Sequence, residues 1–244
     1  MNKVTRFISN ILFDKEIDLV FFPSKTNHKF WDSFVKIGSA HYVIPALYLK
    51  LKQRDYLKFL NNELISYLRE IYNQNLKRNL DLVKEVNEIS QILKTNNIDH
   101  VFLKGAALIS SIYKDSIGIR MVGDIDILIS ENHISKAKNL LKREGYNFFE
   151  RTFKQFIKQE KHLERQVNDK KIFAVELHFS LTPKRNIHNK KFISSRKLFN
   201  KIFIPNKSDL LYHTIINFQK NDLGSLRTAF HFRTLFDIMN LISK

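Results

Sequence analysis

The sequence of 244 residues contains no cysteine, which excludes disulfide bonds, thiolate metal sites and a cysteine nucleophile. It also lacks any apolar run near the roughly 18 residues that a membrane span needs. The N-terminal segment has neither the apolar core nor the small-residue cleavage site of a signal peptide. We therefore expect a cytoplasmic protein with no membrane partner.

Motifs of several well-known active sites are also missing. There is no P-loop, no G-x-G-x-x-G and no G-x-S-x-G pattern. The 9 histidines form no H-x-x-x-H pair and no His/Cys cluster, so no zinc site is predicted. Glycine (6 residues) and proline (4 residues) are scarce, and no linker, internal repeat or low-complexity tract divides the chain.

The sequence does contain a large apolar fraction and a strong basic excess. Apolar residues make up 43%, with 21 phenylalanines, which is typical of a globular protein with a sizeable core. The formal net charge of +17 favours an anionic partner such as RNA, DNA or a nucleotide, although a compositional bias toward lysine gives the same excess. The densest basic run is predicted to be a solvated loop or the edge of a cleft, and consists of Lys184, Arg185, Lys190, Lys191, Arg196 and Lys197.

Helical patterns fill the first 96 residues. Residues 29–53 carry apolar residues at spacings of three and four, and Gly38 and Pro45 divide them into two predicted helices. Residues 56–95 contain no glycine or proline and predict one long helix that ends near Asn96 and packs on a sheet. The apolar face predicted for its second half consists of Leu76, Leu80, Val83, Val86, Ile89 and Leu93.

After residue 97 the pattern changes to alternating strands and helices. IDHVFLKG, DIDILIS and KIFAVELHFSL are predicted strands, and AALISSIY and ISKAKNLLKREGY are the helices between them. The polar stretch LERQVNDKK is predicted to be a hairpin connection to the third strand. The result is an α+β fold with helices over 1–96, a core over 97–204 and further helices over 205–244.

Two aspartates lie in the second of these strands. Because residues i and i+2 of a strand share a face, Asp124 and Asp126 project together and the intervening isoleucines face the other way. Two unpaired carboxylates so close repel each other and are costly to bury. A divalent cation such as Mg²⁺ would offset that cost. The alternative is that the strand end is simply hydrated.

Three neighbouring features favour the metal site. Glu176 stands alone in an apolar strand and would supply a third carboxylate, as in the two-metal sites of nucleotidyl transfer. Lys104 and Gly105 end a strand and begin a helix, where the backbone can approach a phosphate. Arg120, four residues before Asp124, is placed to touch a phosphate or to pair with the carboxylates.

Together these motifs resemble the nucleotidyltransferase superfamily of the DNA polymerase β type, and within it a largely uncharacterised bacterial nucleotidyltransferase family. That family combines L-K-G, a helix with a tyrosine, R-x-x-x-D-I-D, a helix ending in G-Y or G-F, and V-E-x-H. The resemblance covers about residues 85–180, and the flanking helices look similar. The residues that carry it are Leu103, Lys104, Gly105, Tyr113, Arg120, Asp124, Ile125, Asp126, Gly145, Tyr146, Val175, Glu176, Leu177 and His178.

The resemblance implies a small mixed sheet flanked by helices, with Mg²⁺, or Mn²⁺ as an alternative, bound by Asp124, Asp126 and Glu176. It implies that Glu176 shares a metal or acts as the base for an acceptor hydroxyl. It also implies that Lys104 and Gly105 cradle the triphosphate of an NTP substrate. The chain departs from the superfamily at this turn, because the usual Gly-Ser or Gly-Gly is Lys-Gly here. Lys104 would then replace the missing hydroxyl contact.

Other residues have two interpretations each. His178 shares a face with Glu176, and either orients a phosphate or the acceptor or is a hydrogen-bonded strand residue. Tyr113 either packs in the core or stacks on a nucleobase. Arg233 and Asp237 either pair across one helical turn or line the cleft. The remaining histidine candidates are His162, His213 and His231.

These features predict a Mg²⁺-dependent nucleotidyltransferase that transfers NMP from an NTP to an acceptor and releases pyrophosphate. The acceptor is open among an RNA or tRNA end, a small molecule and a protein, because a fold does not fix its substrate. The alternative is a non-catalytic module of the same fold that binds nucleotide, RNA or a partner protein. The Lys-Gly turn favours that alternative, and the intact set of three carboxylates argues for the enzyme.

Overall fold

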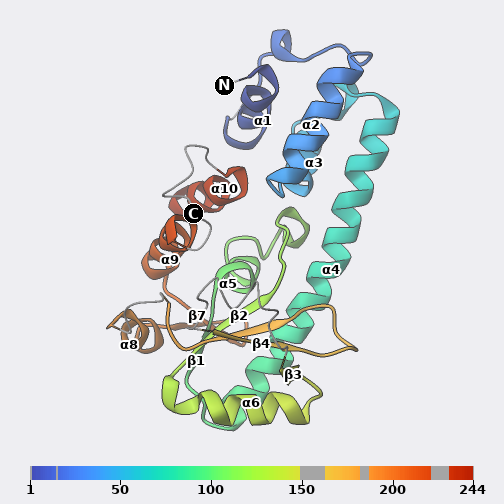
Figure 1. Cartoon of the computed structure of the whole chain (residues 1–244). Helices are drawn as coiled ribbons and strands as arrows, with labels where there is room; N and C mark the ends of the chain where they lie inside the picture. Colours follow the sequence, from blue (N-terminus) through green and yellow to red (C-terminus); the bar gives the residue numbers. More distant parts are fainter. Residues whose placement is uncertain (1, 15, 149–162, 182–186, 221–230, 244) are drawn as a thin grey trace.

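The protein has the predicted α+β fold (Figure 1). It contains a small mixed sheet, and helices precede and follow the strands of this sheet along the chain. The computed structural model describes residues 2–14, 16–148, 163–181, 187–220 and 231–243.

The N-terminal helices begin at polar residues that cap them. α1 (Lys3–Phe13), α2 (His28–Ala40) and α4 (Asn62–Thr95) each follow an asparagine whose side chain accepts a backbone N–H of the first turn. α3 (Ile44–Gln53) has Pro45 in its first turn, where the missing N–H leaves no hydrogen bond unmade. α2 and α3 are the two helices predicted within 29–53. The 3₁₀ turns η1 (Leu19–Phe21) and η2 (Leu57–Phe59) lie in the connections.

α4 runs from the N-terminal helices down to the sheet (Figure 1) and confirms the predicted long helix, with its C-cap at Asn96. The predicted apolar face is wrong in its first half. Leu80 is 45% exposed, whereas Asn75 and Asn79 are buried. Apolar periodicity could not locate this face because polar side chains form part of it. The buried residues of α4 are Leu64, Leu68, Asn75, Asn79, Leu82, Glu85, Val86, Ile89, Ser90 and Leu93.

One of these buried residues carries an acid, and it makes the stability of the fold depend on pH. Glu85 is 3% exposed and accepts a hydrogen bond of 2.6 Å from the hydroxyl of Tyr146. Burial raises the pKa of Glu85, and the hydrogen bond from Tyr146 only partly opposes that shift. The folded state therefore holds the proton more tightly than the unfolded state, whose glutamate pKa is about 4.3. Stability contributed by protonated Glu85 is present below that value and is lost as pH rises through the folded-state pKa.

We expect Glu85→Gln to remove this loss. The melting temperature of the variant relative to that of the wild type should increase as the pH rises from about 4.5 to 8. Glutamine keeps an acceptor for Tyr146 and cannot ionise. Thermal melts at several pH values would measure the difference. Glu63→Gln, at an exposed position near the start of the same helix, is the matched control and should show no such trend. A constant difference for Glu85→Gln at all pH values would contradict the expectation.

The sheet has five strands with the spatial order 1-2-5-4-3 in chain numbering. The strands are β1 (His100–Phe102), β2 (Ile125–Ile129), β3 (Asn147–Phe148), β4 (Leu163–Val167) and β5 (Val175–His178). β2 and β5 run parallel, and the other neighbouring strands are antiparallel. The hairpin connection predicted at LERQVNDKK is wrong in its first part, because these residues form β4 and pair with β5. The connection itself is therefore shorter than predicted.

Both helices predicted between the strands are present, but the first ends at Ser110, so Tyr113 lies in a turn and not on the helix as predicted. α5 (Lys104–Ser110) follows β1, and the 3₁₀ turn η3 (Ile117–Ile119) lies between α5 and β2. The 3₁₀ turn η4 (Glu131–His133) leads into α6 (Ile134–Arg143), which lies below the sheet in Figure 1. Gly145 follows α6 with a φ of +87°, the left-handed conformation that glycine adopts at a helix end.

The two faces of the sheet differ in chemistry. One face carries the isoleucines of β2 together with Val175 and Leu177 of β5, all buried in the main core. That core continues through α4 and the N-terminal helices. The opposite face carries Asp126, Glu176 and His178. Strand alternation thus separates the acidic side chains from the apolar ones, as predicted.

The C-terminal part contains the predicted helices and one unpredicted hairpin. Its elements are α8 (Ile187–Ser194), β6 (Lys197–Phe199), β7 (Ile202–Ile204), α9 (Lys207–Lys220) and α10 (Phe232–Ser243). The loop predicted for the basic run is wrong at Lys190 and Lys191, which lie on α8, and Arg196 pairs with Asp99. Lys184 and Arg185 lie outside the described residues. Among the residues that are described, no helix is both long and apolar enough to cross a membrane.

Candidate active site

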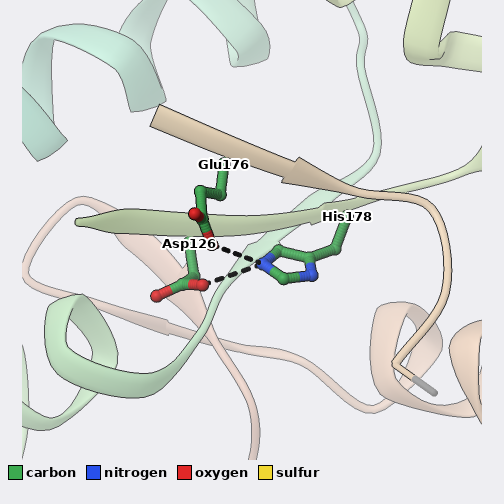
Figure 2. Close-up of side chains that lie close together, drawn as sticks. All are labelled: Asp126, Glu176 and His178. Atoms are coloured by element: carbon green, nitrogen blue, oxygen red, sulfur yellow. Dashed lines mark hydrogen bonds and ion pairs between the residues drawn. The ribbon is translucent and has the colours of Figure 1, made fainter. Parts of the chain in front are cut away.

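The acidic residues of the two parallel strands are direct neighbours. Asp126 of β2 is the register partner of Glu176 on β5, and Leu128 is the partner of His178. Side chains at partner positions of neighbouring strands project to the same side, so Asp126, Glu176 and His178 converge there (Figure 2). The sequence predicted that these residues share a face, and the register adds that the two carboxylates stand side by side.

Short polar contacts join these side chains. Nε2 of His178 lies 2.8 Å from Oδ1 of Asp126 and 3.7 Å from Oε2 of Glu176. Nζ of Lys104, at the start of α5, donates to the same Oδ1 at 2.6 Å. The second carboxylate oxygen of Asp126 takes part in neither contact and points away from His178 (Figure 2). One oxygen of Asp126 is thus held by Lys104 and His178.

The charge on Asp126 is stabilised by its neighbours. The side chain is only 6% exposed, and burial alone would raise its pKa. The positive charge of Lys104 and the hydrogen bonds from His178 and Lys104 outweigh burial and hold the pKa of Asp126 below its ordinary range. Asp126 is therefore ionised at neutral pH.

A polar cavity of about 240 Å³ opens in front of this pair. Asp124, the residue before β2, lines it together with Asp126 and Glu176, so the cavity gathers the three carboxylates named in the sequence. Lys104, Gly105 and Arg120 line it as well. The remaining lining residues are Leu108, Val122, Gly123, Thr214, Asn217, Arg233, Thr234 and Asp237.

The donor atoms fit a divalent cation. One ligand atom each from Asp126, Glu176 and His178 lies within 4.8 Å of the other two. Carboxylate oxygens are the ligands that Mg²⁺ and Mn²⁺ prefer, and imidazole is compatible with Mn²⁺. Asp124 lies outside this closest group of three and would approach a cation from the end of β2.

Comparison with known families decides the relationship. The model of a family described as uncharacterised nucleotidyltransferase matches residues 27–244. The chain belongs to this nucleotidyltransferase family. A search of curated proteins finds no match. The motif resemblance is thereby confirmed, and the family match extends beyond the motifs to α2, α3 and the C-terminal helices.

In this nucleotidyltransferase chain, Arg120 contacts a different carboxylate from the ones expected. Its Nε lies 3.0 and 2.9 Å from the two carboxylate oxygens of Asp237 on α10. The hydroxyl of Tyr113 donates to the same Asp237 at 2.9 Å. The predicted pairing of Arg120 with Asp124 or Asp126 is therefore wrong, because Arg120 pairs with Asp237. The ion pair instead fixes α10 against the segment that leads into β2.

Tyr113 lies in the core rather than on the cavity wall. It is 2% exposed, and its ring stacks on Phe236 with centroids 6.1 Å apart. Its faces are covered, so the packing interpretation holds and stacking on a nucleobase is excluded. Asp237 accepts hydrogen bonds from Arg120 and Tyr113. Arg233 and Asp237 line the cavity, which was the other interpretation.

The Lys-Gly turn is both strained and tightly packed. Lys104 has a φ of +45°, a conformation that non-glycine residues rarely adopt and that is found at functional sites. A Cβ atom on Gly105 would come within 2.6 Å of Val122 and 2.9 Å of Arg120. Glycine therefore allows α5 to lie directly against the segment before Asp124. This reason for Gly105 adds to the phosphate contact predicted from the sequence.

The other histidine candidates differ in their positions. His213 on α9 is buried, and burial together with the nearby charge of Lys104 lowers its pKa to about 3. It is therefore a neutral residue behind the site at physiological pH. His231 packs its ring 5.2 Å from that of His41, away from the carboxylates. His162 lies outside the described residues.

Sequence reasoning missed functional candidates on two helices. Thr214 and Asn217 of α9 face the cavity, and no motif marks them. On α4, the side chain of Arg78 donates to the backbone carbonyl of Val122, two residues before Asp124. The only sequence signal for the α4 residues is a polar group, N-x-x-R-N, in a helix that otherwise packs on the core. Such a pattern is also typical of a solvated helix face.

Proposed function

We propose that the chain is a Mg²⁺-dependent nucleotidyltransferase, with Mn²⁺ as an alternative ion, that transfers NMP from an NTP to an acceptor and releases pyrophosphate. The observation that carries the proposal is the register pair Asp126 and Glu176. Both face a polar cavity that Asp124 and Lys104 also line. Membership of a nucleotidyltransferase family supports the same reaction class.

The arrangement of the carboxylates supports a bound cation, because Asp126 is buried and the side chain of Glu176 is only 15% exposed. Two neighbouring carboxylates on one sheet face repel each other, and Lys104 lies within ion-pair distance of Asp126. A divalent cation held by these residues would neutralise the carboxylate charge and polarise the reacting phosphoryl group. Asp124, Asp126 and Glu176 would hold it, with His178 adjacent. The remaining steps belong to side chains of this chain.

The proposed transfer is an in-line displacement at the α-phosphorus. The acceptor oxygen forms a bond to that phosphorus, the bond to the β-phosphate oxygen breaks, and pyrophosphate leaves with its electron pair. Glu176 takes the proton of the acceptor hydroxyl. Lys104 and Arg233, both on the cavity wall, neutralise charge on the triphosphate.

The size of the cavity limits what it holds. Whole-ligand pockets usually measure roughly 300–1,000 Å³, whereas this cavity measures about 240 Å³ and has a polar lining. It therefore suits the phosphates and the cation, with the nucleoside and the acceptor at its mouth. The acceptor is an RNA or tRNA end, a small molecule or a protein, and the net charge of +17 favours the RNA.

A second candidate function is a non-catalytic module of the same fold that binds nucleotide, RNA or a partner protein. The observation that favours it is the lysine at the turn, because Nζ of Lys104 already occupies one oxygen of Asp126. The two candidates differ in one measurable property, which is the covalent transfer of the α-phosphate.

The first experiment is therefore label transfer. The purified chain is incubated with Mg²⁺ or Mn²⁺, each α-labelled NTP in turn, and separate fractions of cellular RNA, protein and small molecules. We expect one NTP to label one fraction, with release of unlabelled pyrophosphate. Transfer that stops with Asp124→Asn and continues with Asp115→Asn, an exposed aspartate, would support the enzyme. Metal-dependent NTP binding without transfer in any fraction would favour the binding module.

A further inference from the structure

The segment that delivers Asp124 to the site has almost no secondary structure of its own. After η3, residues 120–124 form neither helix nor strand, and β2 begins only at Ile125. Backbone carbonyls in such a segment need partners when they are buried. Here the partners come from side chains of α4.

Two asparagines of α4 hold the first half of the segment. Nδ2 of Asn75 donates to the carbonyls of Gly118 at 2.8 Å and Arg120 at 3.1 Å. Nδ2 of Asn79 donates to the carbonyls of Ile117 and Arg120, both at 2.7 Å. Asn75 and Asn79 are one helical turn apart, so the segment lies along the helix.

Arg78 holds the second half. Its Nη1 donates to the carbonyl of Val122, and its Nη2 lies 3.4 Å from the carbonyl of Gly123. Its guanidinium group also lies 4.4 Å above the ring centre of Phe173, a cation–π distance. Phe173 is three residues before Glu176. One side chain therefore contacts both segments that lead into the carboxylate-bearing strands.

The charge of Arg78 acts on the same region. Burial lowers the pKa of Arg78, and the negative charge of Asp124 opposes that shift. The guanidinium group thus stands close enough to Asp124 to feel its charge while its hydrogen bonds go to the backbone. An arginine suits this place, because its planar fork can reach two carbonyls and still stack on an aromatic ring.

The asparagines that bind the backbone of residues 117–120 lower the stability of the fold. Within the described residues, the amide oxygens of Asn75 and Asn79 are buried without a hydrogen-bond partner. A buried acceptor without a partner destabilises a fold, and an apolar side chain of similar shape would avoid that penalty. Their donor groups therefore serve the position of the 117–120 backbone rather than the packing of α4.

We propose that Arg78, supported by Asn75 and Asn79, is a positioning residue that sets the placement of Asp124 relative to Asp126 and Glu176. The inference rests on the proposed function, since the placement matters through the cation that the carboxylates would hold. Arg78 touches no reacting atom in this role. Its effect passes through the carbonyls of Val122 and Gly123 to the next residue in the chain.

The test uses the full-length chain and two readouts, only one of which depends on the proposed function. The first is hydrogen–deuterium exchange of peptides that cover residues 117–126, measured without metal. The second readout is the affinity for Mn²⁺ without nucleotide, measured from the electron paramagnetic resonance signal of the free ion. The variants are Arg78→Gln, which removes the charge, and Arg78→Lys, which keeps the charge and loses the fork. Lys77→Gln removes a charge from the exposed side of the same turn and is the matched control.

We expect both Arg78 variants to exchange faster over 117–126 and to bind Mn²⁺ roughly 10- to 100-fold more weakly, the usual range for residues that support metal ligands. Lys77→Gln should match the wild type in both measurements. Wild-type Mn²⁺ affinity in Arg78→Lys would overturn the proposal, whatever happens to stability. If Arg78→Gln does not fold, Arg78→Lys decides, and Asn79→Leu with Asn73→Leu as its exposed control provides a further pair. A wild type that binds no Mn²⁺ would reject the proposed function, and the exchange data would still decide whether Arg78 holds the segment.

Discussion

Asp126→Asn is expected to lower the turnover number for nucleotidyl transfer by roughly 10³-fold or more. Stabilisation of transition-state charge by a bound cation is worth several kcal/mol, and each 1.36 kcal/mol corresponds to a factor of ten. Asparagine keeps the shape of the side chain and one oxygen, and it removes the negative charge. That charge lies beside Glu176 and opposite Lys104. The variant therefore removes the negative charge of one proposed metal ligand with little change in volume.

The same change should weaken the fold as well as the activity. The pKa of Asp126 is held below its ordinary range, so the ionised carboxylate stabilises the folded state at neutral pH. Without it, Lys104 loses its carboxylate partner at the wall of the cavity. Activity must therefore be measured on folded protein, with circular dichroism and thermal melts beside the initial rates. Asp115→Asn, on an exposed turn, serves as the charge-matched control.

The outcome separates the two candidate functions. Loss of transfer in Asp126→Asn with retained NTP binding is what an enzyme requires. If the folded variant keeps more than a tenth of the wild-type rate, the carboxylate pair does not carry the chemistry. In that case the transfer would depend on other residues of the cavity. Absence of transfer in the wild type, with NTP binding retained, would instead favour the binding module for this member of the nucleotidyltransferase family.

The elements that were predictable from the sequence are those with local signals. The Asp-Ile-Asp alternation assigns its carboxylates to one strand face, and the isoleucines of β2 are indeed buried on the opposite face. The end of α6 was predictable from Gly145, because a helix commonly ends at a glycine in the left-handed conformation and no distant partner is needed. Motif spacing was also sufficient for the family, since each motif marks a strand end or a helix start within the core.

The features that were not predictable depend on distant partners. Arg120 lies four residues before Asp124 in sequence, and it pairs with Asp237, 117 residues away. The asparagines of α4 resemble solvated residues until the segment at 117–123 lies on them. The register of β2 with β5 brings Asp126 beside Glu176, and nothing in either strand specifies that register alone. In each case the missing information is which surface a side chain meets after folding.

The role of Lys104 is indicated both by its sequence motif and by its contact with a distant residue. Replacement of Lys104 is the second change for which we expect a large effect on activity. A lysine stands where the superfamily pattern has a small residue, and the structure adds that its Nζ lies 2.6 Å from Oδ1 of Asp126. A cation bound by Asp126 and the ammonium group of Lys104 compete for the same carboxylate. We expect Lys104 to turn from Asp126 to a phosphate oxygen when an NTP binds, since Lys104 and Asp126 lie on the wall of one cavity.

Lys104→Met is therefore expected to change two quantities in opposite directions. The affinity for Mn²⁺ in the absence of nucleotide should rise, because the competing charge is gone. The value of kcat/KM for the NTP should fall roughly 10- to 100-fold, the cost of one charged hydrogen bond of about 1.5–3 kcal/mol. Asp126→Asn, in contrast, should lower both quantities. Lys114→Met, at an exposed position nearby in sequence, is the matched control. Unchanged Mn²⁺ affinity together with unchanged kcat/KM in Lys104→Met would show that this lysine only neutralises Asp126 in the fold.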